Sequence, residues 1–153
     1  MSSLKILVDE VDSELKVTLE GQINEDSNFD SLKNLKGDKI TINFKNIEHI
    51  NSCGIRDWIE LQKNHFHFKK INYEQCPQII IEQMNIVAGF VHEKGEIKSF
   101  YAPYYSESED KEYKLLLSPI EVVDGKAPVK KNQNGEELEF DEIEAQYFNF
   151  LKK

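Results

Sequence analysis

Apolar and polar residues alternate along the first part of the chain. Two such runs, with apolar positions 4, 6, 8 and 15, 17, 19, flank the polar pair Asp12-Ser13. A period of two is typical of strands with one buried face, so these runs predict a β-hairpin. The same period recurs over residues 39–45, and shorter runs at 69–73 and 96–101 predict two further strands.

Between these strands the apolar period lengthens to that of a helix. Residues 29–35 predict a short helix that ends before Gly37, and residues 55–66 predict a longer one that buries Trp58. Pro77 opens a third, because proline is favoured at the first helical position. The order β-β-α-β-α-β-α-β predicts an α/β fold, in which a mixed β-sheet is packed by helices.

The pattern changes after residue 101, so the sequence predicts a domain at 1–101 and a C-terminal extension at 102–153. The extension holds a predicted strand at 113–117 and an amphipathic helix over 140–151, which we expect to dock. Two polar turns, at 106–109 and 131–135, are placed like the knuckles of a zinc ribbon. Neither turn has cysteine, so we expect no metal, and the extension is either a degenerate ribbon or a plain hairpin.

Composition and charge narrow the class of partner. The formal net charge of −9 disfavours nucleic acid and anionic membranes as partners. Cys53 and Cys76 are too few and too far apart for a disulfide framework or a zinc site. The acidic start resembles no signal peptide, and no apolar run is long enough for a membrane helix, so we expect a cytoplasmic protein.

The segment from Asn51 to Gly54 joins a predicted strand to the helix of Trp58. We expect Ser52 to be the N-cap residue and Gly54 to leave the helix N-terminus open, where its amides would favour an anion. A phosphate on Ser52 would meet these dipoles, and Arg56 could pair with it one turn later. A simple capping role for Ser52 remains the alternative.

Two segments, residues 19–24 (LEGQIN) and residues 42–55 (INFKNIEHINSCGI), match a known pattern of strand and loop. They resemble, respectively, the second strand with its following turn and the central strand with its signature loop in the STAS domains of bacterial anti-sigma-factor antagonists. The resemblance covers about residues 4–100 and implies a STAS-like sheet. Where the family has carboxylates, this chain has the amides Asn24, Asn43 and Asn51.

The resemblance implies a non-enzymatic signalling protein that acts by protein contact in transcription regulation. Its partner would be a serine-kinase anti-sigma factor that phosphorylates Ser52 and releases the modified form. The implied partner-binding residues are Asn24, Asn51, Ser52, Cys53, Gly54 and Arg56.

Two other functions remain open at the level of sequence. One is a constitutive scaffold that binds through the C-terminal extension, and the other is a sensor of small anions or nucleotides. We expect no enzyme and no cofactor, because the sequence shows no set of acid, base and nucleophile. The sequence leaves the oligomeric state open.

Overall fold

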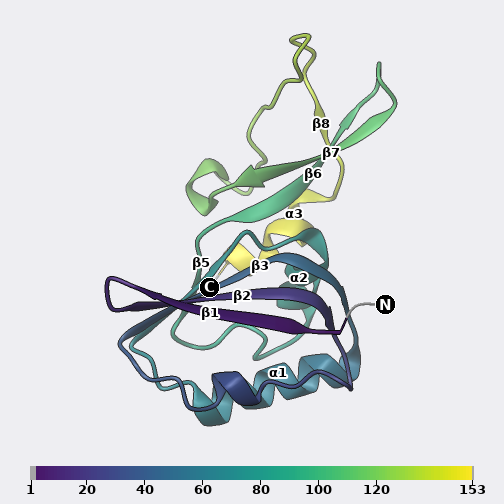
Figure 1. Cartoon of the computed structure of the whole chain (residues 1–153). Helices are drawn as coiled ribbons and strands as arrows, with labels where there is room; N and C mark the ends of the chain where they lie inside the picture. Colours follow the sequence, from purple (N-terminus) through teal and green to yellow (C-terminus); the bar gives the residue numbers. More distant parts are fainter. Residues whose placement is uncertain (1–2, 153) are drawn as a thin grey trace.

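The computed structural model describes residues 3–152 and contains two β-sheets (Figure 1). The larger sheet has the strand order β1-β2-β3-β4-β5, with β1 antiparallel to β2 and the other neighbours parallel. This arrangement confirms the predicted α/β class with a mixed sheet. Its strands are β1 (Lys5–Val11), β2 (Glu14–Ile23), β3 (Lys39–Ile50), β4 (Lys70–Glu74) and β5 (Gly95–Ile97).

Two helices of two or more turns connect β3 to β4 and β4 to β5. They are α1 (Ser52–His65) and α2 (Gln78–Ile86), and α1 lies beneath the sheet in Figure 1. Trp58 of α1 is fully buried, as the sequence predicts. Its ring packs against one aromatic ring from β3, Phe44, and against three from loops, namely Phe29, Phe66 and Phe90.

The helix predicted over residues 29–35 is not formed. Only a single 3₁₀ turn, η1 (Asp30–Leu32), is present, although Phe29 and Leu32 are both buried as the apolar spacing indicates. Forming the first helical turn fixes several residues for one hydrogen bond, and a segment this short offers little propagation in return. Burial of two side chains therefore produced an anchored turn in place of a helix.

The strand predicted over residues 96–101 is divided between the two sheets. β5 ends at Ile97, and β6 (Phe100–Ser106) begins after only two residues as the central strand of a second sheet. The amide of Cys76 donates to Ser99 O (3.2 Å), and the amide of Tyr101 donates to Cys76 O (2.8 Å). These bonds fix the chain where it passes from one sheet to the other.

The second sheet has the order β7-β6-β8, where β7 is Lys111–Leu117 and β8 is Glu139–Phe140. The 3₁₀ turn η2 (Pro119–Glu121) follows β7. The helix predicted over 140–151 is shorter than expected, because only α3 (Glu144–Tyr147) and the 3₁₀ turn η3 (Phe148–Leu151) form. The segment docks as predicted, since the rings of Phe148 and Phe150 meet Phe100 at centroid distances of 6.1 and 5.0 Å.

The two polar turns of the extension lie together and are joined by hydrogen bonds. The Glu136 carboxylate accepts from Ser106 Oγ (2.7 Å) and Ser108 Oγ (2.6 Å) in the first turn. Asn132 Nδ2 in the second turn donates to Glu109 Oε1 (2.9 Å) and to Glu136 Oε1 (2.8 Å). A carboxylate thus connects the two turns.

Acidification is expected to weaken this connection. Hydrogen bonds from Ser106 and Ser108 lower the pKa of Glu136 to about 2, so the ionised form is the one that stabilises the fold. Its contribution is complete above the unfolded pKa of about 4.3 and is lost as the pH falls from there through about 2. Thermal unfolding followed by circular dichroism from neutral to acidic pH measures this loss.

The matched control for this experiment is a substitution of Glu137, the exposed glutamate next to Glu136. Glu136→Gln should lower the melting temperature at neutral pH and should reduce the further fall in melting temperature on acidification. Glu137→Gln should behave like the wild type. If the difference in melting temperature between wild type and Glu136→Gln stays the same down to the lowest pH, protonation of Glu136 is not the cause of the loss of stability in acid.

Candidate functional site

Helix α1 begins at the carboxyl end of β3, and its N-cap is Asn51. Asn51 Oδ1 accepts from the amide of Gly54 at 3.0 Å, while Ser52 is the first residue of the helix. The prediction that Ser52 is the cap was therefore wrong by one residue. Asparagine and serine are both favoured caps, and here the longer asparagine side chain reaches the amide three residues on.

Gly54 brings α1 into direct contact with the end of β2. A Cβ at this position would lie 2.5 Å from the carbonyl carbon and oxygen of Ile23 and 2.7 Å from Asn24 N. The expectation that Gly54 leaves the helix end open was wrong, because Gly54 is buried and serves close packing. The first four backbone amides of a helix have no acceptor within the helix. In α1, two of these four already have another acceptor in the protein, because Gly54 N donates to Asn51 Oδ1 and Asn51 N donates to Ile23 O (3.0 Å).

The side chain of Asn51 also connects α1 to the turn after β2. Asn51 Nδ2 donates to Glu25 Oε2 at 2.7 Å, and this bond is the main reason that the pKa of Glu25 is lowered. An amide can donate to Glu25 and accept from Gly54 at once, which an ionised carboxylate at position 51 could not do. The amide at this position therefore holds turn and helix together.

The predicted residue Asn24 lies in the same turn, but its side chain is used within it. Asn24 Oδ1 accepts from the amide of Asp26 (2.9 Å), and the amide of Asn24 donates to Ser27 Oγ (2.8 Å). Asn24 therefore shapes the turn that presents Glu25 to Asn51.

The residues predicted for contact differ in their accessibility. Ser52 and Arg56 are exposed, Cys53 is half-buried, and Gly54 is buried. Arg56 lies one turn after Ser52, and its Nε is 4.0 Å from the carboxylate of Asp57. We define the Ser52 surface as the exposed or half-buried members of this set, Asn24, Asn51, Ser52, Cys53 and Arg56, with Gly54 beneath it.

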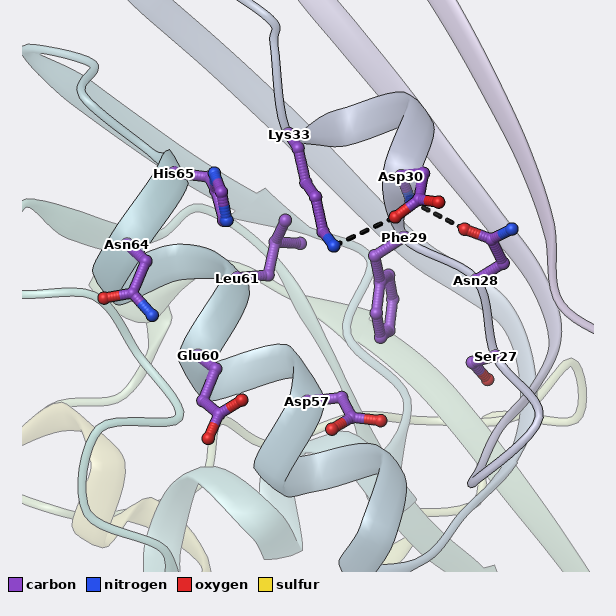
Figure 2. A pocket seen from close by; sticks show the side chains of 10 residues that line it. All are labelled: Ser27, Asn28, Phe29, Asp30, Lys33, Asp57, Glu60, Leu61, Asn64 and His65. Atoms are coloured by element: carbon purple, nitrogen blue, oxygen red, sulfur yellow. Dashed lines mark hydrogen bonds and ion pairs between the residues drawn. The ribbon is translucent and has the colours of Figure 1, made fainter.

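A shallow cavity of about 330 Å³ opens beside this surface, between α1 and residues 27–33 (Figure 2). Asp57 and Glu60 line it from α1, and Asp30 and Lys33 face them and form an ion pair of 2.9 Å. Sequence reasoning did not predict this cavity. The spacing of residues 57, 60 and 64 along one face of α1 was the available signal.

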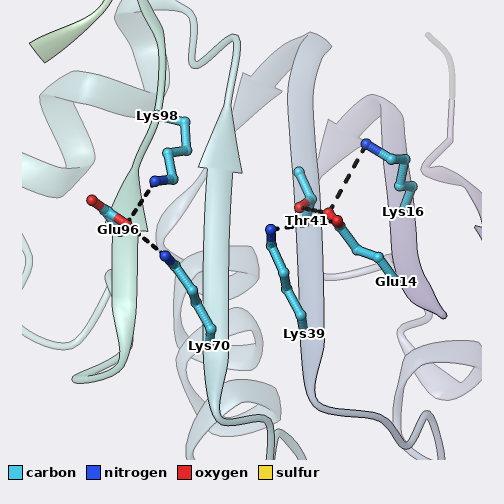
Figure 3. Close-up of polar contacts among 7 residues, drawn as sticks. All are labelled: Glu14, Lys16, Lys39, Thr41, Lys70, Glu96 and Lys98. Atoms are coloured by element: carbon cyan, nitrogen blue, oxygen red, sulfur yellow. Dashed lines mark hydrogen bonds and ion pairs between the residues drawn. The ribbon is translucent and has the colours of Figure 1, made fainter. Parts of the chain in front are cut away.

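Charged side chains also gather on one face of the larger sheet (Figure 3). Lys39 and Lys70 are register partners on neighbouring strands, and each reaches a carboxylate at 3.4 Å, Glu14 for Lys39 and Glu96 for Lys70. A hydrogen bond from Thr41 and the nearby lysines lower the pKa of Glu14. Each of the two opposed lysines thus has a carboxylate from the strand on its other side, and these ion pairs offset the repulsion between the two lysines.

Within residues 3–152, no group of His, Cys, Asp and Glu side chains has the arrangement of a metal site, and no helix could span a membrane. A scan of protein-family models gave no match to this chain, and a search of curated proteins gave no significant match.

Proposed function

We propose that the chain is a non-enzymatic signalling protein that acts by protein contact at the Ser52 surface, like the anti-sigma-factor antagonists that its sequence resembles. The observation that carries this proposal is the exposed hydroxyl of Ser52 in the first turn of α1, one turn before the exposed Arg56. A kinase can reach such a hydroxyl without unfolding the helix. The proposed partner is a serine-kinase anti-sigma factor, which uses ATP to modify Ser52.

A phosphate on Ser52 would be accommodated by the fold but not by a docked partner. It adds about −1.5 to −2 charges at a helix N-terminus, where the helix dipole and Arg56 favour negative charge. The same surface already carries Glu25 and Asp57 close by, so it would become strongly acidic. Repulsion and the cost of desolvating the phosphate would then release a partner that had bound the unmodified surface.

The substitution Ser52→Glu is expected to weaken partner binding at least about tenfold, a loss of about 1.4 kcal/mol, with the fold unchanged. Ser52→Ala should bind as the wild type does but resist release by the kinase. The measurement is affinity capture from native lysate followed by mass spectrometry, with affinities of the captured partner then determined by calorimetry.

The control is Ser31→Glu, which makes the same chemical change at an exposed serine of η1. It should capture the same partner as the wild type. Equal capture by the wild type and Ser52→Glu would contradict the proposal, and so would a captured partner that lacks kinase activity toward Ser52.

A second function is favoured by apolar side chains on the extension. Ile120, Val129 and Val123 are 85%, 67% and 64% exposed, which is unusual for side chains of this size. They suit a scaffold that binds a constitutive partner through the extension. In the same capture experiment this function requires that Ile120→Lys lose the partner while Ser52→Glu keeps it.

A further inference from the structure

Strand β1 forms one edge of the five-stranded sheet; of the usual protections of an edge it carries charged side chains, but it has neither a bulge nor a proline. It pairs with β2 over seven residues in one unbroken register, from Lys5↔Glu20 to Val11↔Glu14, and it contains no proline. Natural sheets commonly shield such an edge with a bulge, a proline or a covering segment. By contrast, β5 at the opposite edge is only three residues long.

The hairpin geometry determines which backbone groups of β1 face outward. Val11 and Glu14 flank the two-residue turn Asp12-Ser13, so they form a hydrogen-bonded pair, and such pairs recur at every second residue. The amides and carbonyls of Ile6, Val8 and Glu10 therefore point away from β2. The amide of Glu10 accordingly donates to the carboxylate of Asp9 (3.0 Å) and not to β2.

Apolar side chains of β1 are exposed on both faces of the sheet. Leu7 and Val11 are 46% and 41% exposed on one face, and Val8 is 42% exposed on the other. Alternate strand residues point to opposite faces, so an added strand would cover both sets together.

We propose that β1 pairs antiparallel with β1 of a second copy of the chain, about a twofold axis at Leu7. In this register Ile6 lies opposite the second copy's Val8, and these two exchange backbone hydrogen bonds because both face outward. Lys5 lies opposite Asp9, so two ion pairs form, one on each side of the axis. The result is one continuous sheet made from both copies, closed by a twofold axis.

Charge complementarity selects this register over its neighbours. An axis at Val8 also satisfies the backbone, but it places Leu7 opposite Asp9 and Ile6 opposite Glu10, so apolar side chains would face carboxylates. Over residues 5–9, an axis at Leu7 pairs leucine with leucine and lysine with aspartate, and the latter is a favourable cross-strand pair. Asp9 exchanges its local bond to the Glu10 amide for the ion pair with Lys5.

A disulfide reports this register directly. Residues at a non-hydrogen-bonded antiparallel pair have Cα atoms about 4.5 Å apart, within the range of about 4.4–6.8 Å for a disulfide. In a Cys53→Ser background, Leu7→Cys should form a covalent dimer under mild oxidation, because the two copies meet at the axis. Val8→Cys should not, because residue 8 of the second copy lies opposite Ile6, two residues along the strand and about 7–8 Å away. Crosslinking through Val8→Cys in place of Leu7→Cys would overturn the proposed register.

Sedimentation velocity of the full chain, from micromolar to hundreds of micromolar concentration, tests the association itself. The wild type should be increasingly dimeric, and Leu7→Lys should be monomeric throughout because it places two ammonium groups at the axis. Val129→Lys, a similar change at an exposed residue of the extension, should dimerise as the wild type does. A monomeric wild type at every concentration, or a dimer that persists in Leu7→Lys, would overturn the proposal.

Discussion

Replacing Gly54 with alanine is expected to destabilise the protein by about 3 kcal/mol, at the upper end of the usual cost of overpacking. Intrinsic helix propensity alone would give the opposite sign, because alanine is favoured over glycine within a helix by about 1 kcal/mol. Packing decides the outcome, since the new Cβ would lie 2.5 Å from the carbonyl group of Ile23. Those atoms belong to the backbone at the end of β2 and cannot move aside as a flexible side chain would.

Urea unfolding followed by Trp58 fluorescence measures this loss. The matched control is Ser52→Ala, two residues earlier and exposed, which should change the stability by less than about 0.5 kcal/mol. Stabilisation by Gly54→Ala would show that α1 does not approach Ile23 this closely, and the placement of the Ser52 surface beside the turn at Asn24 would fall with it.

Replacing Gln62 with leucine is expected to cost about 3 kcal/mol, although it exchanges a polar side chain for an apolar one in the core. Gln62 is 1% exposed; its Nε2 donates to Phe90 O at 2.8 Å, and its Oε1 accepts from the Tyr73 hydroxyl. Burial raises the pKa of Tyr73, so the hydroxyl stays protonated and needs an acceptor. Leucine would leave the O–H of Tyr73 without an acceptor in the interior, at about 1–3 kcal/mol, although the hydroxyl oxygen still accepts from the amide of His92 (3.0 Å). It would also remove one of the two donors to Phe90 O, the other being Trp58 Nε1.

A double-mutant cycle with Tyr73→Phe separates this effect from a simple loss of packing. The double variant should lose less stability than the sum of the two single variants, because removing both partners leaves fewer buried groups unpaired. Additive losses in urea unfolding would contradict the proposed coupling. The cycle also tests how α1 is held to β4, because Gln62 lies on α1 and Tyr73 on β4.

Elements with a long and regular period were predictable from sequence, and so were the short strands β4 and β7, whereas the extent of the other short elements was not. The hairpin β1–β2, the start of β3 and the helix of Trp58 all repeat their pattern over several periods. The six residues 96–101 contain too few apolar positions to show that Ile97 and Phe100 belong to different sheets. Which sheet a strand joins depends on contacts with distant residues such as Phe148 and Phe150, and a local pattern does not encode these.

The candidate site was predictable in its place but not in its geometry. The sequence located a strand-to-helix loop at Asn51-Ser52, and the structure has α1 begin there. It could not show which of two adjacent capping residues bonds to Gly54, nor that Glu25, twenty-six residues earlier, accepts from Asn51. The acidic lining of the neighbouring cavity depends equally on how α1 packs against η1, which spacing along one helix does not determine.

The short junction between β5 and β6 fixes the distance between the two proposed binding surfaces, the Ser52 surface and the extension. Ser99 in this junction accepts from the amide of Gln75 at 2.8 Å, so the extension is held to the larger sheet without a flexible tether. In Figure 1 the second sheet rises above the larger one while α1 lies beneath it. A partner with two binding sites could contact the Ser52 surface and the extension at once if its sites are as far apart as these two surfaces. Its second contact would then form at a high effective concentration, with no linker in this chain to be ordered. A partner whose sites are closer together could make only one contact and would gain nothing. The molecule would then select its partners by length as well as by surface chemistry.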